Sequence, residues 1–145
     1  MNILSLIIFA TGLIWAVLKK KEMLDSVSEC AYIMPHWAFS VWMALTAIIL
    51  LPFLIERLSE DWQFLGFLAV VGALIVAASG YYKTEAKTLH YVGGSLAFVM
   101  AQIVATITIP LLLLLWVPLI GVLLWKRPKE WLFYVEIIGY LMVLI

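Results

Sequence analysis

The sequence is poor in charged residues and in cysteine. Asp, Glu, Lys and Arg make up 12% of the 145 residues, about half the share found in an ordinary soluble domain. Nine basic residues balance nine acidic ones, so there is no excess of positive charge to attract nucleic acid. The single cysteine, Cys30, excludes an internal disulfide. These absences argue against a soluble globular protein and against a nucleic-acid-binding protein.

The common catalytic motifs are also missing. The sequence has no phosphate-binding loop, no HExxH, no CxxC and no serine in a nucleophile-elbow context. We therefore expect no cofactor, and no metal site follows from the spacing of the histidines and carboxylates.

The sequence is rich in long apolar runs. Hydrophobic residues make up 66% of the chain, and the charges that interrupt them are clustered. Because a helix needs about 20 apolar residues to cross a bilayer, these runs predict an all-α fold, a polytopic transmembrane helical bundle in a single domain, residues 1–145. The six predicted spans are residues 3–18, 37–55, 62–80, 91–109, 111–125 and 131–145.

The boundary between the fourth and fifth spans rests on Pro110. Residues 91–125 carry no formal charge, and one straight helix over this run would be about 52 Å long, far more than a bilayer core. Proline lacks a backbone N–H and disfavours helix in the residue before it. We therefore expect the chain to turn back near Pro110.

The distribution of basic residues predicts the orientation. With six spans, the first, third and fifth loops share one side and hold eight of the nine basic residues, and Arg57 is on the other side. Basic loops stay in the cytoplasm, so both termini are expected outside it, in a multi-pass protein of a cell membrane, with a bacterial inner membrane as the expected location. The first span lacks a basic residue before it and a cleavage site after it, which predicts an uncleaved anchor. The eight basic residues are Lys19, Lys20, Lys21, Lys83, Lys87, Lys126, Arg127 and Lys129.

Two spans carry small residues at four-residue spacing. Small side chains let helix backbones approach closely in a membrane, so we expect both faces to pack against neighbouring helices. These residues are Ala69, Ala73 and Ala77 in the third span and Gly93, Ala97, Ala101 and Ala105 in the fourth.

Glu136 is the most informative polar residue, because an ionisable group inside a span usually faces a partner or a wet cavity. The six-span topology places His90 and His36 at the same end of the bundle as Glu136, which makes these three the candidate catalytic residues. The alternative is a structural role, with Glu136 reaching the interface or a helix partner and the histidines lying in the interface. Candidate ligand-binding residues near them are Asp25, Ser28, Glu29 and Tyr140.

The first hydrophilic loop, residues 19–36, contains a short helical pattern. Leu24, Val27 and Ala31 recur at helical spacing, which predicts a short interfacial helix capped by Asp25 or Ser26. An ordinary hydrophilic connection is the alternative. In the fourth span, Gln102 is expected to hydrogen-bond across helices.

Two short stretches resemble a known family. The stretch SVSECAYIMPHWAFSVWM, leading into the second span, and LHYVGG, opening the fourth, resemble six-helix membrane proteins of the DRAM/Sfk kind. The resemblance implies a six-helix membrane fold, with Ser26, Ser28 and His90 at family-like positions. The likeness covers about a quarter of the chain.

Three functions are compatible with these residues. The leading hypothesis is a small non-enzymatic membrane protein that acts as a scaffold, a partner subunit, or a binder of a lipid or small ligand. The second is a membrane-embedded hydrolase or lipid-modifying enzyme with a cytoplasm-facing His/Glu site. The third is a small proton-coupled transporter acting as an oligomer. The expected partners are the lipid bilayer, a bound lipid or small ligand, and a second copy or another membrane protein.

Overall fold

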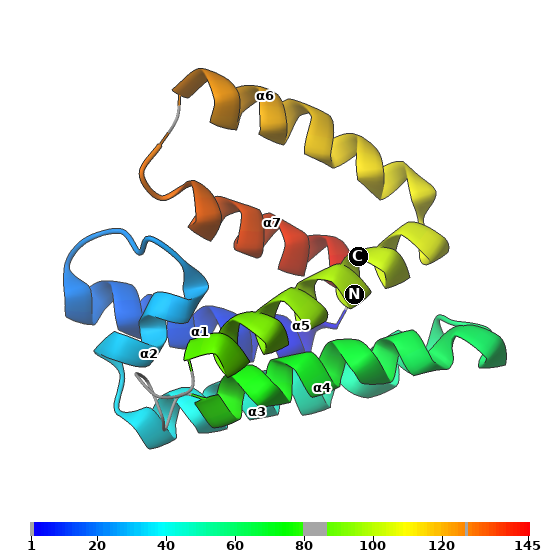
Figure 1. The fold of residues 1–145 in the computed structure, drawn as a ribbon, viewed down its shortest axis with the longest axis horizontal. Helices are drawn as coiled ribbons and strands as arrows, with labels where there is room; N and C mark the ends of the chain where they lie inside the picture. Colours follow the sequence, from blue (N-terminus) through cyan, green and yellow to red (C-terminus); the bar gives the residue numbers. More distant parts are fainter. Residues whose placement is uncertain (1, 80–86, 127) are drawn as a thin grey trace.

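The computed structural model describes residues 2–79, 87–126 and 128–145, and every regular element in these ranges is a helix (Figure 1). Lys83 and Arg127, two residues used to predict the orientation, lie outside the described residues, as does Gly80, the predicted end of the third span. The longer helices are α1 (Ile3–Lys20), α3 (His36–Glu56), α4 (Gln63–Ser79), α5 (Lys87–Thr108), α6 (Trp116–Lys126) and α7 (Trp131–Leu144). The shorter ones are η1 (Val27–Glu29), α2 (Cys30–Ile33), η2 (Glu60–Trp62) and η3 (Pro110–Leu115).

Successive long helices run in opposite directions, so the chain passes back and forth along one axis (Figure 1). Among the described residues, four helical stretches are long and apolar enough to cross a membrane: Ile3–Lys20, His36–Glu56, Glu60–Ser79 and Lys87–Thr108. The two remaining apolar stretches, Pro110–Lys126 and Trp131–Leu144, are shorter than 18 residues. The helical fold is confirmed, with four helices of spanning length.

The helix break predicted at Pro110 is confirmed. Helix α5 ends at Thr108, and Ile109 leaves the helical conformation with φ −142° and ψ 85°. The chain then turns back as η3 and α6 (Figure 1). The region predicted as the fifth span, residues 111–125, consists of two parts: a 3₁₀ helix over Pro110–Leu115 and an α-helix over Trp116–Lys126. Proline at the start, without a backbone N–H, is compatible with this tighter geometry.

Helix α5 begins at Lys87, four residues before the predicted span, so Lys87 and His90 lie on the helix and not in a loop. Hydropathy locates the apolar part of a helix, but backbone hydrogen bonding can continue into polar sequence. This extension places the His90 side chain within the first turn of α5, beside the end of α4.

Helices α4 and α5 approach closely at small residues. A Cβ atom added to Gly72 of α4 would overlap the backbone of Ala97 and lie 2.7 Å from the carbonyl oxygen of Gly93 on α5. Ala69, Ala77 and Ala105 are buried, at 5%, 4% and 2% exposed. Ala73 and Ala101 are partly buried and pack against the same core cluster. The α4–α5 contact therefore depends on backbone approach at Gly72, which the four-residue pattern did not include.

Helix α6 lies at the edge of the molecule. It has no buried residue, and Trp125 is 85% exposed. Helix α7, in contrast, buries Phe133, Gly139, Met142, Val143 and Leu144 among the other helices. The reversal at Pro110 thus returns α7, more than α6, to the core.

We predict that Gly72→Ala destabilises the protein by about 1–3 kcal/mol, because the added methyl group meets backbone atoms that cannot rotate away. Thermal unfolding in detergent, followed by circular dichroism, measures this. Gly121→Ala in α6 is the matched control, since a Cβ there meets no atom within 4 Å. The control should unfold at an unchanged or higher temperature, because alanine favours helix. Equal unfolding temperatures for the two variants would contradict the close approach of α4 and α5.

Candidate functional site

The segment between α1 and α3 folds inward against the helices. Leu24 and Cys30 are 0% exposed, and Val27 and Ala31 are also buried. We call residues 24–34 the inner loop. The predicted short helix is present as η1 and α2, and the predicted cap is confirmed at Ser26, whose Oγ accepts a hydrogen bond from the Glu29 N–H at 3.2 Å. The inner loop is therefore part of the core and not a surface connection.

An ion pair ties this loop to the end of α1. Lys20 Nζ lies 2.8 Å from Glu29 Oε1. The other carboxylate oxygen of Glu29 accepts a hydrogen bond from the Asp25 N–H at 2.7 Å. Helix α1 ends at Lys20, and the next residue, Lys21, adopts a left-handed conformation with φ 63° that turns the chain toward the loop.

Glu136 holds the inner loop from α7. Its Oε2 accepts a hydrogen bond from the Val27 N–H at 2.6 Å. The Phe133 N–H, one turn earlier on α7, donates to the carbonyl oxygen of Asp25 at 3.2 Å. The hydrogen bond between the Val27 N–H and the Glu136 carboxylate is charge-assisted, and such bonds are about twice as strong as neutral ones. The carboxylate therefore fixes the backbone immediately before Ser28.

His90 holds the inner loop from α5. Its Nε2 lies 2.9 Å from Ser28 Oγ, and its Nδ1 lies 2.9 Å from Ser79 Oγ at the end of α4. The Ser79 hydroxyl donates to the Val76 carbonyl oxygen at 2.8 Å, so its single proton is used there. In a neutral imidazole, Nδ1–H then donates to Ser79, and Nε2 accepts the hydroxyl proton of Ser28.

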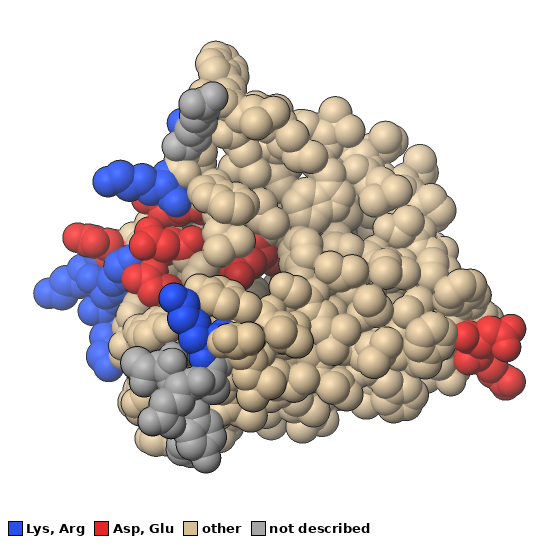
Figure 2. Space-filling view, in the orientation of Figure 1, with Lys and Arg blue, Asp and Glu red and all other residues tan. Residues whose placement is uncertain are grey.

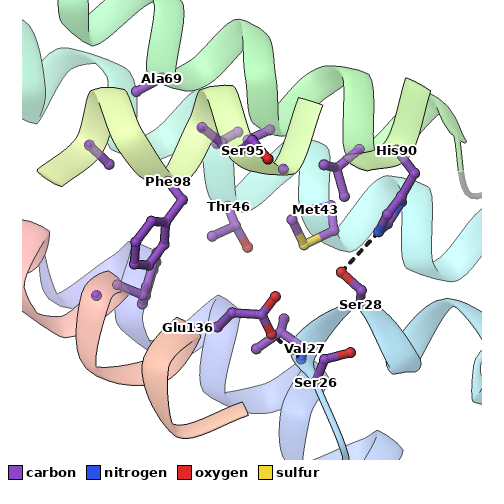
Figure 3. Close-up of a pocket in the computed structure, with 18 of the residues that line it drawn as sticks. Ser26, Val27, Ser28, Met43, Thr46, Ala69, His90, Ser95, Phe98 and Glu136 are labelled. Atoms are coloured by element: carbon purple, nitrogen blue, oxygen red, sulfur yellow. Dashed lines mark hydrogen bonds between the residues drawn. The ribbon is translucent and has the colours of Figure 1, made fainter. Parts of the chain in front are cut away.

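These residues form the polar end of a cavity of about 670 Å³ (Figure 3). Figure 3 shows His90 and Glu136 reaching the inner loop from two different helices. Away from this end, the lining is mostly apolar and comes from α3, α4, α5 and α7, with Phe9 of α1. Apolar lining residues include Met43, Leu50, Ala69, Val70, Phe98 and Val143.

The structure brings most of the predicted site residues together. Glu136, His90, Asp25, Ser28, Glu29 and Tyr140 all line this cavity. His36 does not: it is exposed at the first residue of α3. Helix α3 begins at His36, directly after Pro35, so this side chain lies at the end of the helix and outside the cavity lining. The prediction that His36 joins Glu136 and His90 was wrong.

Tyr140 and Gln102 connect helices deeper in the cavity. Tyr140 Oη lies 2.6 Å from Ser5 Oγ of α1. Gln102 Nε2 donates to the Gly139 carbonyl oxygen on α7 at 3.0 Å, which confirms the predicted hydrogen bond across helices. In the described ranges, no group of three or more His, Cys, Asp or Glu residues is arranged to hold a metal ion.

Ser79 was not predicted as a site residue. It is one polar residue at the end of an apolar helix, and nothing in its local sequence marks it as a site residue. Its role depends on the end of α4 lying beside His90, eleven residues later in the sequence. Proximity in sequence to a histidine is a weak signal, since it does not reveal which way either side chain points.

The charged side chains gather where this cavity has its polar end. Figure 2 shows the lysine side chains of the visible face at the end where α1 finishes, with acidic side chains among them. Only acidic side chains are visible at the opposite end.

Comparison with known proteins gives no significant match to any protein-family model, curated protein or solved structure.

We predict slow alkylation of Cys30. Burial raises the pKa of its thiol to about 12, and the negative charge of Glu29 acts in the same direction. The reactive species is the thiolate, so reaction with an uncharged maleimide should still accelerate with pH above pH 9, where an ordinary cysteine has levelled off. A plateau near pH 9 would contradict the burial of this thiol.

Glu136→Ala should accelerate the alkylation of Cys30 by about tenfold or more, because hydrogen bonds to charged groups contribute about 1.5–3 kcal/mol. The variant removes the acceptor of the Val27 N–H and loosens the inner loop. Glu136→Gln keeps an acceptor oxygen and should give a smaller increase. Identical rates for the wild type and both variants would show that Glu136 does not hold the loop.

Proposed function

We propose that this chain is a six-span membrane protein with both termini outside the cytoplasm, in a bacterial inner membrane. The alternating direction of the helices supports six crossings (Figure 1). Although Pro110–Lys126 is short in residues, its first six residues rise about 2.0 Å each and its other eleven about 1.5 Å. The stretch is therefore about 28 Å long, close to the thickness of a bilayer core.

The positions of tryptophan support the same arrangement. Trp37, Trp62, Trp125 and Trp131 lie at helix ends and are 60%, 47%, 85% and 53% exposed. Tryptophan is enriched at both membrane–water interfaces, where its ring and N–H suit the headgroup region. Six helices are also what the resemblance to DRAM/Sfk-type proteins implies, and we propose a relationship to that family on the same grounds.

We infer that the protein binds a lipid or a similar amphiphilic molecule. The observation that carries this inference is the cavity, which combines a mostly apolar lining with a polar end. Its volume of about 670 Å³ lies within the range of about 300–1,000 Å³ common for ligand pockets. A molecule with a polar headgroup and an acyl chain matches both parts of the lining.

The location of the polar end supports the same ligand class. In the proposed orientation, this end faces the basic, cytoplasmic side, at the level of lipid headgroups. Ser26, Ser28, His90 and Glu136 supply donors and acceptors there. A lipid could thus enter with its headgroup at the interface and its chain among the helices, without carrying a polar group into an apolar region.

We predict that wild-type protein purified in mild detergent retains a lipid that native mass spectrometry detects as a bound mass. Ala101→Phe should reduce the retained fraction about 5–30-fold, corresponding to a loss of one or two kcal/mol, because the ring enters the cavity.

Val92→Phe is the control for the added ring. Val92 lies on the same helix, is 56% exposed and does not line the cavity. It should retain lipid as the wild type does. A wild-type protein without bound lipid, or equal retention by the two variants, would contradict the proposed function.

A further inference from the structure

The polar end of the cavity contains a serine paired with a histidine. Ser28 comes from the inner loop, His90 from the start of α5 and Ser79 from the end of α4. The two histidine nitrogens lie 2.9 Å from the two serine hydroxyls, one on each side of the ring. Both Ser28 and His90 line the cavity.

This arrangement has the three parts of an activated nucleophile. A serine hydroxyl becomes a nucleophile when a neighbouring base accepts its proton, and the base works best when a third group fixes its ring. Ser79 can act as that third group, because its oxygen accepts the Nδ1–H and leaves Nε2 facing Ser28. The backbone before Ser28 is held separately, through the Val27 N–H and Glu136.

We propose that Ser28 is the catalytic nucleophile and His90 the general base of a hydrolase that cleaves carboxylic esters of long-chain acids. The proposal rests on the proposed function, because the apolar part of the same cavity would hold the acyl chain. The ester carbonyl would lie at the polar end, beside Ser28. Ser79 and Glu136 are positioning residues, since they act through His90 and through the inner loop.

The reaction balances with water as the only co-reactant. Ser28 Oγ forms a bond to the ester carbonyl carbon while His90 Nε2 takes the hydroxyl proton. The C–O bond to the alcohol then breaks, and the alcohol oxygen receives that proton from His90. Water next attacks the acyl-Ser28 ester with His90 as base, which releases the carboxylic acid and restores the Ser28 hydroxyl.

The first experiment is covalent labelling with a long-chain alkyl fluorophosphonate, followed by peptide mapping, together with hydrolysis of p-nitrophenyl decanoate in detergent. Wild-type protein should be labelled on Ser28 and should hydrolyse the ester. Ser28→Ala should abolish labelling, and His90→Gln should reduce both rates by about 100-fold or more. Ser59→Ala, an exposed serine before η2 that does not line the cavity, is the matched control and should keep both rates.

Bound lipid, measured on the same samples, separates this proposal from the proposed function. Retained lipid in Ser28→Ala with lost labelling would support both. A wild-type protein that retains lipid but is neither labelled nor active would overturn the hydrolase and leave the binding function standing. Labelling at another serine, or unchanged rates in Ser28→Ala, would also overturn it. A wild-type protein that is labelled on Ser28 without retaining lipid would contradict the binding function alone.

The positioning role of Ser79 is tested with a measurement that loss of a merely structural contact would leave unchanged. Ser79→Ala should lower kcat for p-nitrophenyl decanoate by about tenfold with little change in KM, because it affects the histidine and not the substrate contact. Ser79→Thr keeps the hydroxyl and should restore most of kcat. A change confined to KM, or no rescue by threonine, would contradict the positioning role.

Discussion

The reversal of the chain at Ile109–Pro110 is the constraint on which the site depends. Proline cannot continue the backbone hydrogen bonding of α5, and a helix of the full apolar length would be too long for a bilayer. After the reversal, α6 and the short turn that follows it return the chain, so that α7 begins beside the inner loop (Figure 1). Without this path, Glu136 could not reach the Val27 N–H.

A second constraint is that polar groups inside an apolar bundle need partners within the protein. Several polar side chains within the bundle join neighbouring helices: Ser40 Oγ donates to the Ala77 carbonyl oxygen at 2.6 Å, and Trp42 Nε1 donates to that of Ile8 at 2.9 Å. Across the described ranges, no buried side-chain nitrogen or oxygen lacks a partner. At the inner loop the same requirement pairs His90 with Ser28 and Glu136 with the N–H of Val27. Because Val27 and Ser28 are adjacent in sequence, both contacts lie at one end of the cavity. The groups that hold the loop are thus also the groups that a ligand would meet.

Much of the fold follows from local sequence, but the details of the site do not. Apolar runs and charge clusters located the helices, and Pro110 located the break. The cap was narrowed to Asp25 or Ser26, because a cap needs only a backbone N–H a few residues away, and the structure shows Ser26 in this role. The contact of His90 with Ser28 joins residues 62 positions apart, and the contact of Glu136 with Val27 joins residues 109 apart, so helical periodicity carries no information about either. His36 was misplaced for the same reason, because sharing an end of the bundle does not decide whether a side chain faces the core. The exposure of α6 was also unforeseen, since its sequence is as apolar as that of the packed helices.

The most direct test of the six-span arrangement is the sidedness of three exposed positions in a Cys30→Ala background. Glu22→Cys, Glu60→Cys and Lys129→Cys place single thiols after α1, between α3 and α4, and before α7. Labelling with a membrane-impermeant maleimide, in membrane vesicles of both orientations, should place positions 22 and 129 on one side and position 60 on the other. If position 129 is labelled together with position 60, the chain does not cross the membrane between α5 and α7, and the proposed assembly of Glu136, His90 and the inner loop at one interface is wrong.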